Sequence, residues 1–163
     1  FYAGCTTLVA TLFGLAGICC YAYIAHWSNR TTFAALTCAR VVVSTAEVVQ
    51  TLRLNPGWGI SDEVLFLVGE AAVRPLIGMM FYIPILVLQS EFVIKGQEAI
   101  VYGTLAGMAN FGGLVAGAVG SYVTNACGIE DCHFQPLPIA LVLSHMALPM
   151  VIVPLAYLVL PVK

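Results

Sequence analysis

An acid and a base lie four positions apart inside a long apolar stretch, where ionisable side chains are rare. Glu70 precedes Arg74, and this spacing places both side chains on one face of a helix with the acid first, which is the more favourable order. Ionisable groups at membrane depth usually face the interior of a helix bundle or a water-filled cavity. Two interpretations follow: a binding site for a substrate or a proton, or a buried pair that holds adjacent helices together.

A second base and acid, Arg40 and Glu47, are seven positions apart in another apolar stretch. They share nearly the same helix face but lie about 10 Å apart along the helix axis, which is too far for a direct pair. Each is therefore expected to meet another helix, with Glu70 or Arg74 as the candidate partner. An arginine can bind a substrate carboxylate through two parallel hydrogen bonds, and an interhelical ion pair is the structural alternative.

His145 lies in the last apolar stretch, beside Ser144. Its imidazole suits proton transfer, and the structural alternative is a hydrogen bond to a neighbouring backbone carbonyl. Asn110, in the preceding stretch, is a polar group that could line a cavity. The candidates for substrate binding or ion coupling are therefore Glu70, Arg74, Arg40, Glu47, Asn110 and His145.

Small residues recur every three or four positions in the stretch that contains Asn110. The series is Gly103, Gly107, Asn110, Gly113, Gly117 and Ser121. On a helix these positions form one broad face, and small side chains there let another backbone approach closely. We expect the four glycines to be helix-packing positions.

The sequence carries no motif typical of an enzyme: there is no Gly-x-Ser-x-Gly, no phosphate-binding loop and no His-Glu-x-x-His. It therefore predicts neither catalysis nor a cofactor. Cys127, Cys132 and His133 share a polar connection, but no second ligand pair accompanies them, and no metal site is expected. Cys127 and Cys132 could form a disulfide if their connection faces an oxidising compartment.

The composition excludes an ordinary soluble domain. Of the 163 residues, 61% are apolar and 9% are charged, with six Lys and Arg against eight Asp and Glu. In soluble proteins, by comparison, roughly 45–50% of the residues are apolar and roughly 25% are charged. So few charges cannot cover a water-exposed surface of this size, so the lipid bilayer is the expected environment. The net charge of −2 argues against nucleic acid as a partner, because such binding needs clustered Lys and Arg.

Five apolar stretches are long enough to cross a bilayer core of about 30 Å as helices. They cover about residues 3–25, 32–54, 62–92, 98–124 and 137–160. Strands are not expected, because the stretches are too long and do not alternate with period two. Pro75 and Pro84 in the third stretch, and Pro149 and Pro154 in the fifth, should bend their helices. The sequence thus predicts an all-α integral membrane protein, with residues 1–163 as a single membrane domain.

The basic residues favour one orientation. If the helices alternate in direction, Arg30, Lys95 and Lys163 share one side, while Arg53 and the acidic loop at residues 130–131 face the other. The side richer in basic residues is expected to be cytoplasmic or its equivalent, and it includes the C-terminus. Because the sequence opens at Phe1 within an apolar run, we expect it to be part of a longer chain or a processed product.

Short motifs in a fixed order extend over about two-thirds of the chain. They are Arg53-Leu54-Asn55, Gly59-Ile60-Ser61-Asp62, Gly69-Glu70 with Pro75, Pro84, Lys95-Gly96-Gln97-Glu98, Tyr102, Ala106-Gly107, Asn110-Phe111-Gly112, and Ser144-His145 with Pro149. In this order and spacing the stretch from Arg53 to Pro161 resembles the folate–biopterin transporter family, a branch of the major facilitator superfamily.

The resemblance implies a twelve-helix fold made of two six-helix halves, in which the five spans correspond to helices 8–12. It implies transport of folates or pterins, coupled to an ion gradient, in a plasma membrane or a plastid membrane. Arg74 or Arg40 would then face a substrate carboxylate. Glu70 would face the pterin nitrogens or a proton.

Five helices alone should not transport, because alternating access needs two halves that move around a central site. The expected partners are therefore the remaining N-terminal helices of a full transporter or neighbouring membrane subunits. The alternative is a non-transporting structural or accessory subunit of a larger membrane complex. In that case the glycine-rich face would be the docking surface, and Glu70 and Arg74 would be a structural pair.

Overall fold

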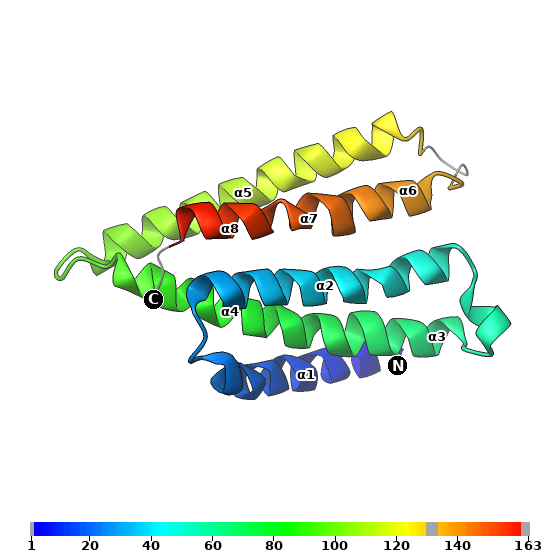
Figure 1. Cartoon of the computed structure of the whole chain (residues 1–163), viewed down its shortest axis with the longest axis horizontal. Coiled ribbons are helices and arrows are strands. Elements are labelled where there is room, and N and C mark those ends of the chain that lie inside the picture. The colour runs from blue at the N-terminus through cyan, green and yellow to red at the C-terminus, as the bar shows by residue number, and fades with distance from the viewer. Residues whose placement is uncertain (1, 130–133, 161–163) are drawn as a thin grey trace.

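The computed structural model describes residues 2–129 and 134–160, and all the regular structure within them is helical (Figure 1). Five helical spans in this part of the chain are long and apolar enough to cross a membrane: Ala3–Ile24, Asn29–Thr51, Asp62–Glu91, Glu98–Ala126 and Leu137–Val159. The all-α membrane architecture predicted from the sequence is thereby confirmed. The predicted Cys127–Cys132 pair, His133, the acidic loop at 130–131 and Lys163 involve positions outside the described residues.

Two of the spans are interrupted helices. The first two spans are α1 (Tyr2–Ile24) and α2 (Asn29–Thr51), followed by the short 3₁₀ turn η1 (Asn55–Trp58). The third span joins α3 (Asp62–Phe66), the π-helical segment η2 (Leu67–Val73) and α4 (Arg74–Glu91), and α5 (Glu98–Ala126) is the fourth. The fifth span joins α6 (Leu137–Leu141), the π-helical segment η3 (Val142–Ala147), α7 (Leu148–Met150) and α8 (Ile152–Val159).

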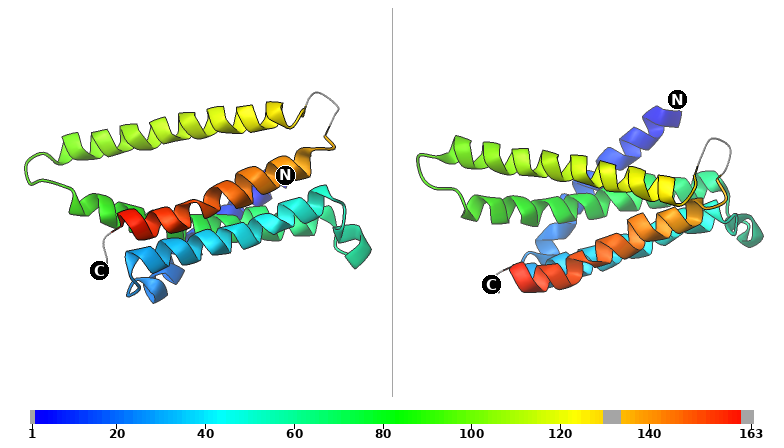
Figure 2. Two further views of the ribbon diagram at one scale, coloured as in Figure 1. Left: turned by 45° about the horizontal axis from the view of Figure 1, so that its top comes forward. Right: turned by 90° about the horizontal axis from the view of Figure 1, so that it is seen from above.

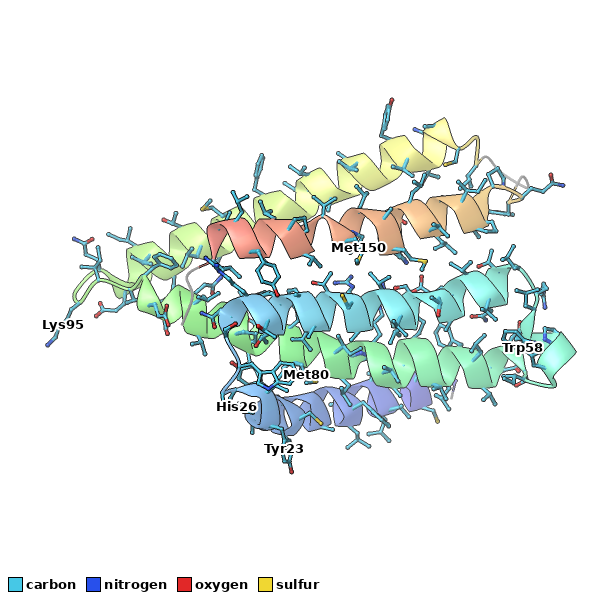
Figure 3. The ribbon with its side chains drawn as sticks, in the orientation of Figure 1. Tyr23, His26, Trp58, Met80, Lys95 and Met150 are labelled. Atoms are coloured by element: carbon cyan, nitrogen blue, oxygen red, sulfur yellow. The ribbon has the colours of Figure 1, made fainter. Side chains whose placement is uncertain are left out.

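α2 occupies the middle of the array. It contacts every helical segment of the third span on one side and every segment of the fifth span on the other. α1 packs on the outer side of the third span, against α4 and η2 (Figures 1 and 2). The labelled side chains in Figure 3 place His26 and Lys95 toward one end of the spans and Trp58 at the other, as alternating helix directions require.

The core is thin and consists of a few apolar side chains between neighbouring spans. Phe33 on α2 is buried, and its ring meets Phe81 on α4 edge-on, with the ring centroids 5.1 Å apart. Most of the large apolar side chains of α1 and α5 are exposed instead, including Leu8, Leu12 and Leu114. Lipid tails would cover such surfaces, because a bilayer core is as apolar as these side chains.

Polar caps and a short turn set the start of the second and third spans. Ser28 and Ser61 each cap a helix by accepting a hydrogen bond from the backbone N–H three residues later. Between the spans, the fully buried Asn55 donates to the Ile60 carbonyl at 3.0 Å and to Asp62 Oδ1 at 2.6 Å. Arg53 binds Asp62 Oδ2 at 2.8 Å from a left-handed backbone with φ of 55°. This network fixes where the third span begins.

Each interrupted span widens into a π turn just before a proline. In the third span the Arg74 N–H reaches back to the Gly69 carbonyl, and Pro75 follows. In the fifth span the Leu148 N–H reaches back to the Leu143 carbonyl, and Pro149 follows. Proline cannot donate the next backbone hydrogen bond, so the ladder is already broken there and tolerates a wider turn. In the sequence the two prolines predict bends, but the π geometry is not apparent from it.

α5 is the outermost helix, and its main contact is with α6. Its 29 residues include no buried side chain. A methyl group added at Gly103, Gly107, Gly113 or Gly117 would meet no atom of the described chain within 4 Å. The described helices therefore do not pack against these glycines. The prediction that they are helix-packing positions now requires a helix outside the described part of the chain.

A close approach between α1 and α4 generates a first prediction. A Cβ at Gly17 of α1 would lie 2.3 Å from the Leu76 carbonyl oxygen of α4. Gly17→Ala should force the two helices apart and lower the unfolding free energy by about 1–3 kcal/mol, the usual cost of overpacking. The check is thermal unfolding in detergent, followed by circular dichroism. Gly4→Ala is the matched control, because no atom lies within 4 Å of its added methyl group. Equal melting temperatures for the two variants would contradict the described α1–α4 contact.

The turn between the second and third spans generates another prediction. Asn55→Ala removes both hydrogen bonds of the buried amide and leaves the Ile60 carbonyl without its partner. We expect a loss of about 1–3 kcal/mol in unfolding free energy. Asn125→Ala, at an exposed site near the end of α5, should change stability by less than about 0.5 kcal/mol. Unfolding in detergent measures both, and an Asn55→Ala protein as stable as the parent would show that the network does not hold the turn.

Candidate functional site

The charged side chains of three spans meet at Glu47 on α2. Arg74 Nη1, at the start of α4, lies 3.0 Å from Glu47 Oε1. His145 Nδ1, from η3 in the fifth span, contacts the other oxygen, Oε2, of the same carboxylate. The same Arg74 nitrogen also contacts Glu70 Oε2, one helical turn earlier in η2. We call Glu47, Glu70, Arg74 and His145 the charged cluster.

The two π segments carry the members of the cluster that flank α2. Glu70 lies in η2, and Arg74 is the first residue after η2. His145 lies in η3. A π turn changes the rotation per residue, so it shifts which side chains face a neighbouring helix. The segments therefore determine which side chains from the third and fifth spans reach Glu47. π turns of this kind are often found at functional sites.

A cavity of about 180 Å³ opens beside the cluster, between α2 and α4. Its lining residues are Arg40, Val43, Ser44, Glu47, Arg74, Ile77, Gly78 and Phe81. Glu47 and Arg74 contribute charged groups to this lining, and Arg40 contributes a second guanidinium. Apolar side chains and the aromatic ring of Phe81 form the rest of the wall between α2 and α4. The cavity can therefore offer charge, hydrogen bonds and a flat apolar surface to the same ligand.

The two arginines of this cavity differ in their partners. Arg74 contacts two carboxylates, and 36% of its side chain is exposed. Arg40 is exposed and lies midway along α2, and no acid among the described residues forms a salt bridge with it. A charge near the centre of a span is costly in lipid, so its exposure indicates a face turned to water or to another helix.

A second hollow, of about 510 Å³, separates α5 from the fifth span. Its wall includes Thr124 on α5 and both Ser144 and His145 on η3. His145 therefore contacts Glu47 in the wall of the first cavity and also lines the second.

The structure brings together four of the six candidates and places a fifth beside them. Glu70 pairs with Arg74, Glu47 meets Arg74 across the helices, and Arg40 shares their cavity. The contact of His145 with Glu47 was not foreseen, because 98 positions separate the two residues and no local spacing links them. Asn110 is exposed on α5 and lines neither cavity.

The cluster can bind and orient a polar group. It places two carboxylates beside one guanidinium and one imidazole. Among residues 2–129 and 134–160, no three His, Cys, Asp or Glu side chains are grouped as a metal ion would require. The arrangement is suited to recognising a polar or charged solute within a membrane.

Several relatives that this chain resembles are named as folate or folate-biopterin transporters. A folate-biopterin transporter of Synechocystis sp. is 25% identical over 150 residues, which are 90% of this chain and 30% of that protein. Folate transporter 2 of Plasmodium falciparum is 24% identical over 137 residues, which are 83% and 30% of the two chains. A probable folate-biopterin transporter 4 of Arabidopsis thaliana is 26% identical over 89 residues, 55% of this chain and 18% of the other.

This chain thus spans about 30% of the length of the first two relatives. No solved structure matches it. The sequence model of the BT1 family, by contrast, matches residues 1–163 without a break. Because that match covers every position, the chain belongs to the BT1 family.

Proposed function

We propose that this chain forms the C-terminal part of a major-facilitator-type carrier that moves folate- or pterin-like solutes across a membrane. The observation that carries the proposal is the charged cluster beside a cavity that Arg40 also lines. Relatives named as folate or folate-biopterin transporters support the same class of solute. None of the matched relatives is named as an enzyme.

The chemistry of the cavity suits such a solute. Pterins are flat aromatic rings with N–H donors and ring acceptors, and folates add carboxylates. Carboxylate oxygens of Glu47 or Glu70 can accept from ring N–H groups, and a guanidinium such as that of Arg40 can bind a carboxylate through two parallel hydrogen bonds. Phe81 and Ile77 provide an apolar wall for the ring. His145 and Glu47 can take up and release a proton during transport.

The size of the cavity supports a site shared with further helices. About 180 Å³ is less than the roughly 300–1,000 Å³ of ligand sites that enclose a drug-sized molecule. In major facilitator proteins the substrate lies between two halves of the fold. In our proposal this chain supplies one wall, and the N-terminal helices of a full transporter supply the other.

The proposal includes the orientation of the spans in the membrane. Arg30 lies in the first turn of α2, Lys95 follows α4, and α8 ends at that same end of the spans (Figures 1 and 3). An excess of basic residues marks the cytoplasmic or equivalent side. We therefore propose that these connections and the C-terminus face that side, in a plasma membrane or a plastid membrane.

A non-transporting accessory subunit is a second candidate, and one observation favours it. α5 has no buried residue, and its glycines are open to a partner. The mass of the mature polypeptide separates the two functions. A carrier predicts a species of roughly three times 17.3 kDa, as the 30% coverage of its relatives implies. A 17 kDa species that copurifies in fixed stoichiometry with other membrane subunits would contradict the carrier.

Neutral replacements in the cluster test transport itself. Arg74→Gln or Glu70→Gln should lower uptake of labelled folate and of biopterin by about tenfold or more, since a charge-assisted hydrogen bond contributes about 1.5–3 kcal/mol. Lys95→Gln, in the connection after α4, is the control and should leave uptake unchanged. Membrane abundance of each variant is measured in parallel by immunoblot. Unchanged uptake in both cluster variants would remove the cluster from the transport site.

A further inference from the structure

We infer that Arg40 distinguishes solutes that carry a carboxylate from neutral solutes of the same ring type, whereas Arg74 does not. The inference rests on the proposed function and assigns separate roles to the two arginines of one cavity. It names the class of solute that needs Arg40: a flat ring with an anionic tail.

Arg74 already has partners for its charge. Its Nη1 lies 3.0 Å from Glu47 and also contacts Glu70, so two carboxylates share one guanidinium. A solute carboxylate approaching this end of the cavity would compete with two carboxylates that already share the guanidinium.

Arg40 has the opposite electrostatic setting. It is exposed, it lines the same cavity, and no acid within the described chain is paired with it. It lies midway between Asn29 and Thr51, the ends of α2, where an unpaired cation is most costly in lipid. A carboxylate bound there would neutralise the guanidinium through two parallel hydrogen bonds.

The spacing of the charges gives the solute a direction. Arg40 and Glu47 are about 10 Å apart along the α2 axis. Between them the wall is formed by Val43 and Ser44, with Ile77 and Phe81 opposite on α4. In this proposal a flat ring lies against the apolar stretch with its N–H donors toward the acid at Glu47, and the anionic tail of the solute reaches toward Arg40. A neutral pterin would use the ring contacts alone.

The test compares two solutes in the protein as the cell makes it, with all its helices present. Uptake of labelled folate, which carries carboxylates, and of biopterin, which carries none, is measured over a range of concentrations. Arg40→Gln should raise the KM for folate by about tenfold or more and leave the KM for biopterin within about twofold. Arg40→Lys keeps the charge but loses the two-point geometry, so a smaller rise for folate alone is expected. Lys95→Gln is the charge-matched control.

Each outcome bears on one of the two proposals. Equal changes in KM for folate and biopterin, or no change for either, overturn the role of Arg40 while transport stands. Absence of uptake of both solutes by the parent protein overturns the proposed function and this inference with it. If Arg40→Gln fails to reach the membrane, Arg40→Lys decides, and a KM shift shared by both solutes contradicts the inference.

Discussion

The carboxylate of Glu47 is the interaction on which the arrangement of the spans depends. One oxygen meets Arg74 from the third span and the other meets His145 from the fifth, with α2 between them. Only 14% of the Glu47 side chain is exposed. A carboxylate in an apolar setting is costly without partners, so this group constrains both neighbouring spans at once. Glu47 and Arg74 also line the cavity beside this contact.

The positions of these partners depend on two breaks in regular helix. Pro75 and Pro149 remove a backbone donor at equivalent places in the third and fifth spans, and a π turn precedes each. Those turns carry Glu70 and His145 to the two sides of α2. The π segments interrupt the regular hydrogen-bond ladder of their helices, and they place an acid and an imidazole beside the guanidinium of Arg74 and the carboxylate of Glu47. The same helical irregularity that positions the cluster also leaves polar groups facing the two cavities.

Much of this was predictable from the sequence. The five spans follow from length and hydropathy, and the Glu70–Arg74 pair follows from helix spacing. The need of Glu47 for a partner on another helix follows from its place in an apolar span, too far from Arg40 for a direct pair. The contact between Glu47 and His145 was not predictable, since it depends on how distant helices rotate against each other. The π turns were missed as well, because proline indicates a break in the ladder but not its form. The open face of α5 could not be foreseen from glycine spacing, which predicts contact and not the identity of the partner.

The most direct test of this account is a double-mutant cycle between Glu47→Gln and His145→Leu. The free energy of unfolding in detergent is measured for the parent, both single variants and the double variant. If the two side chains bind each other across α2 and the fifth span, their effects should be non-additive by about 0.5–2 kcal/mol. If the double variant instead loses the sum of the two single losses to within about 0.3–0.5 kcal/mol, as independent sites do, the central role of Glu47 is contradicted.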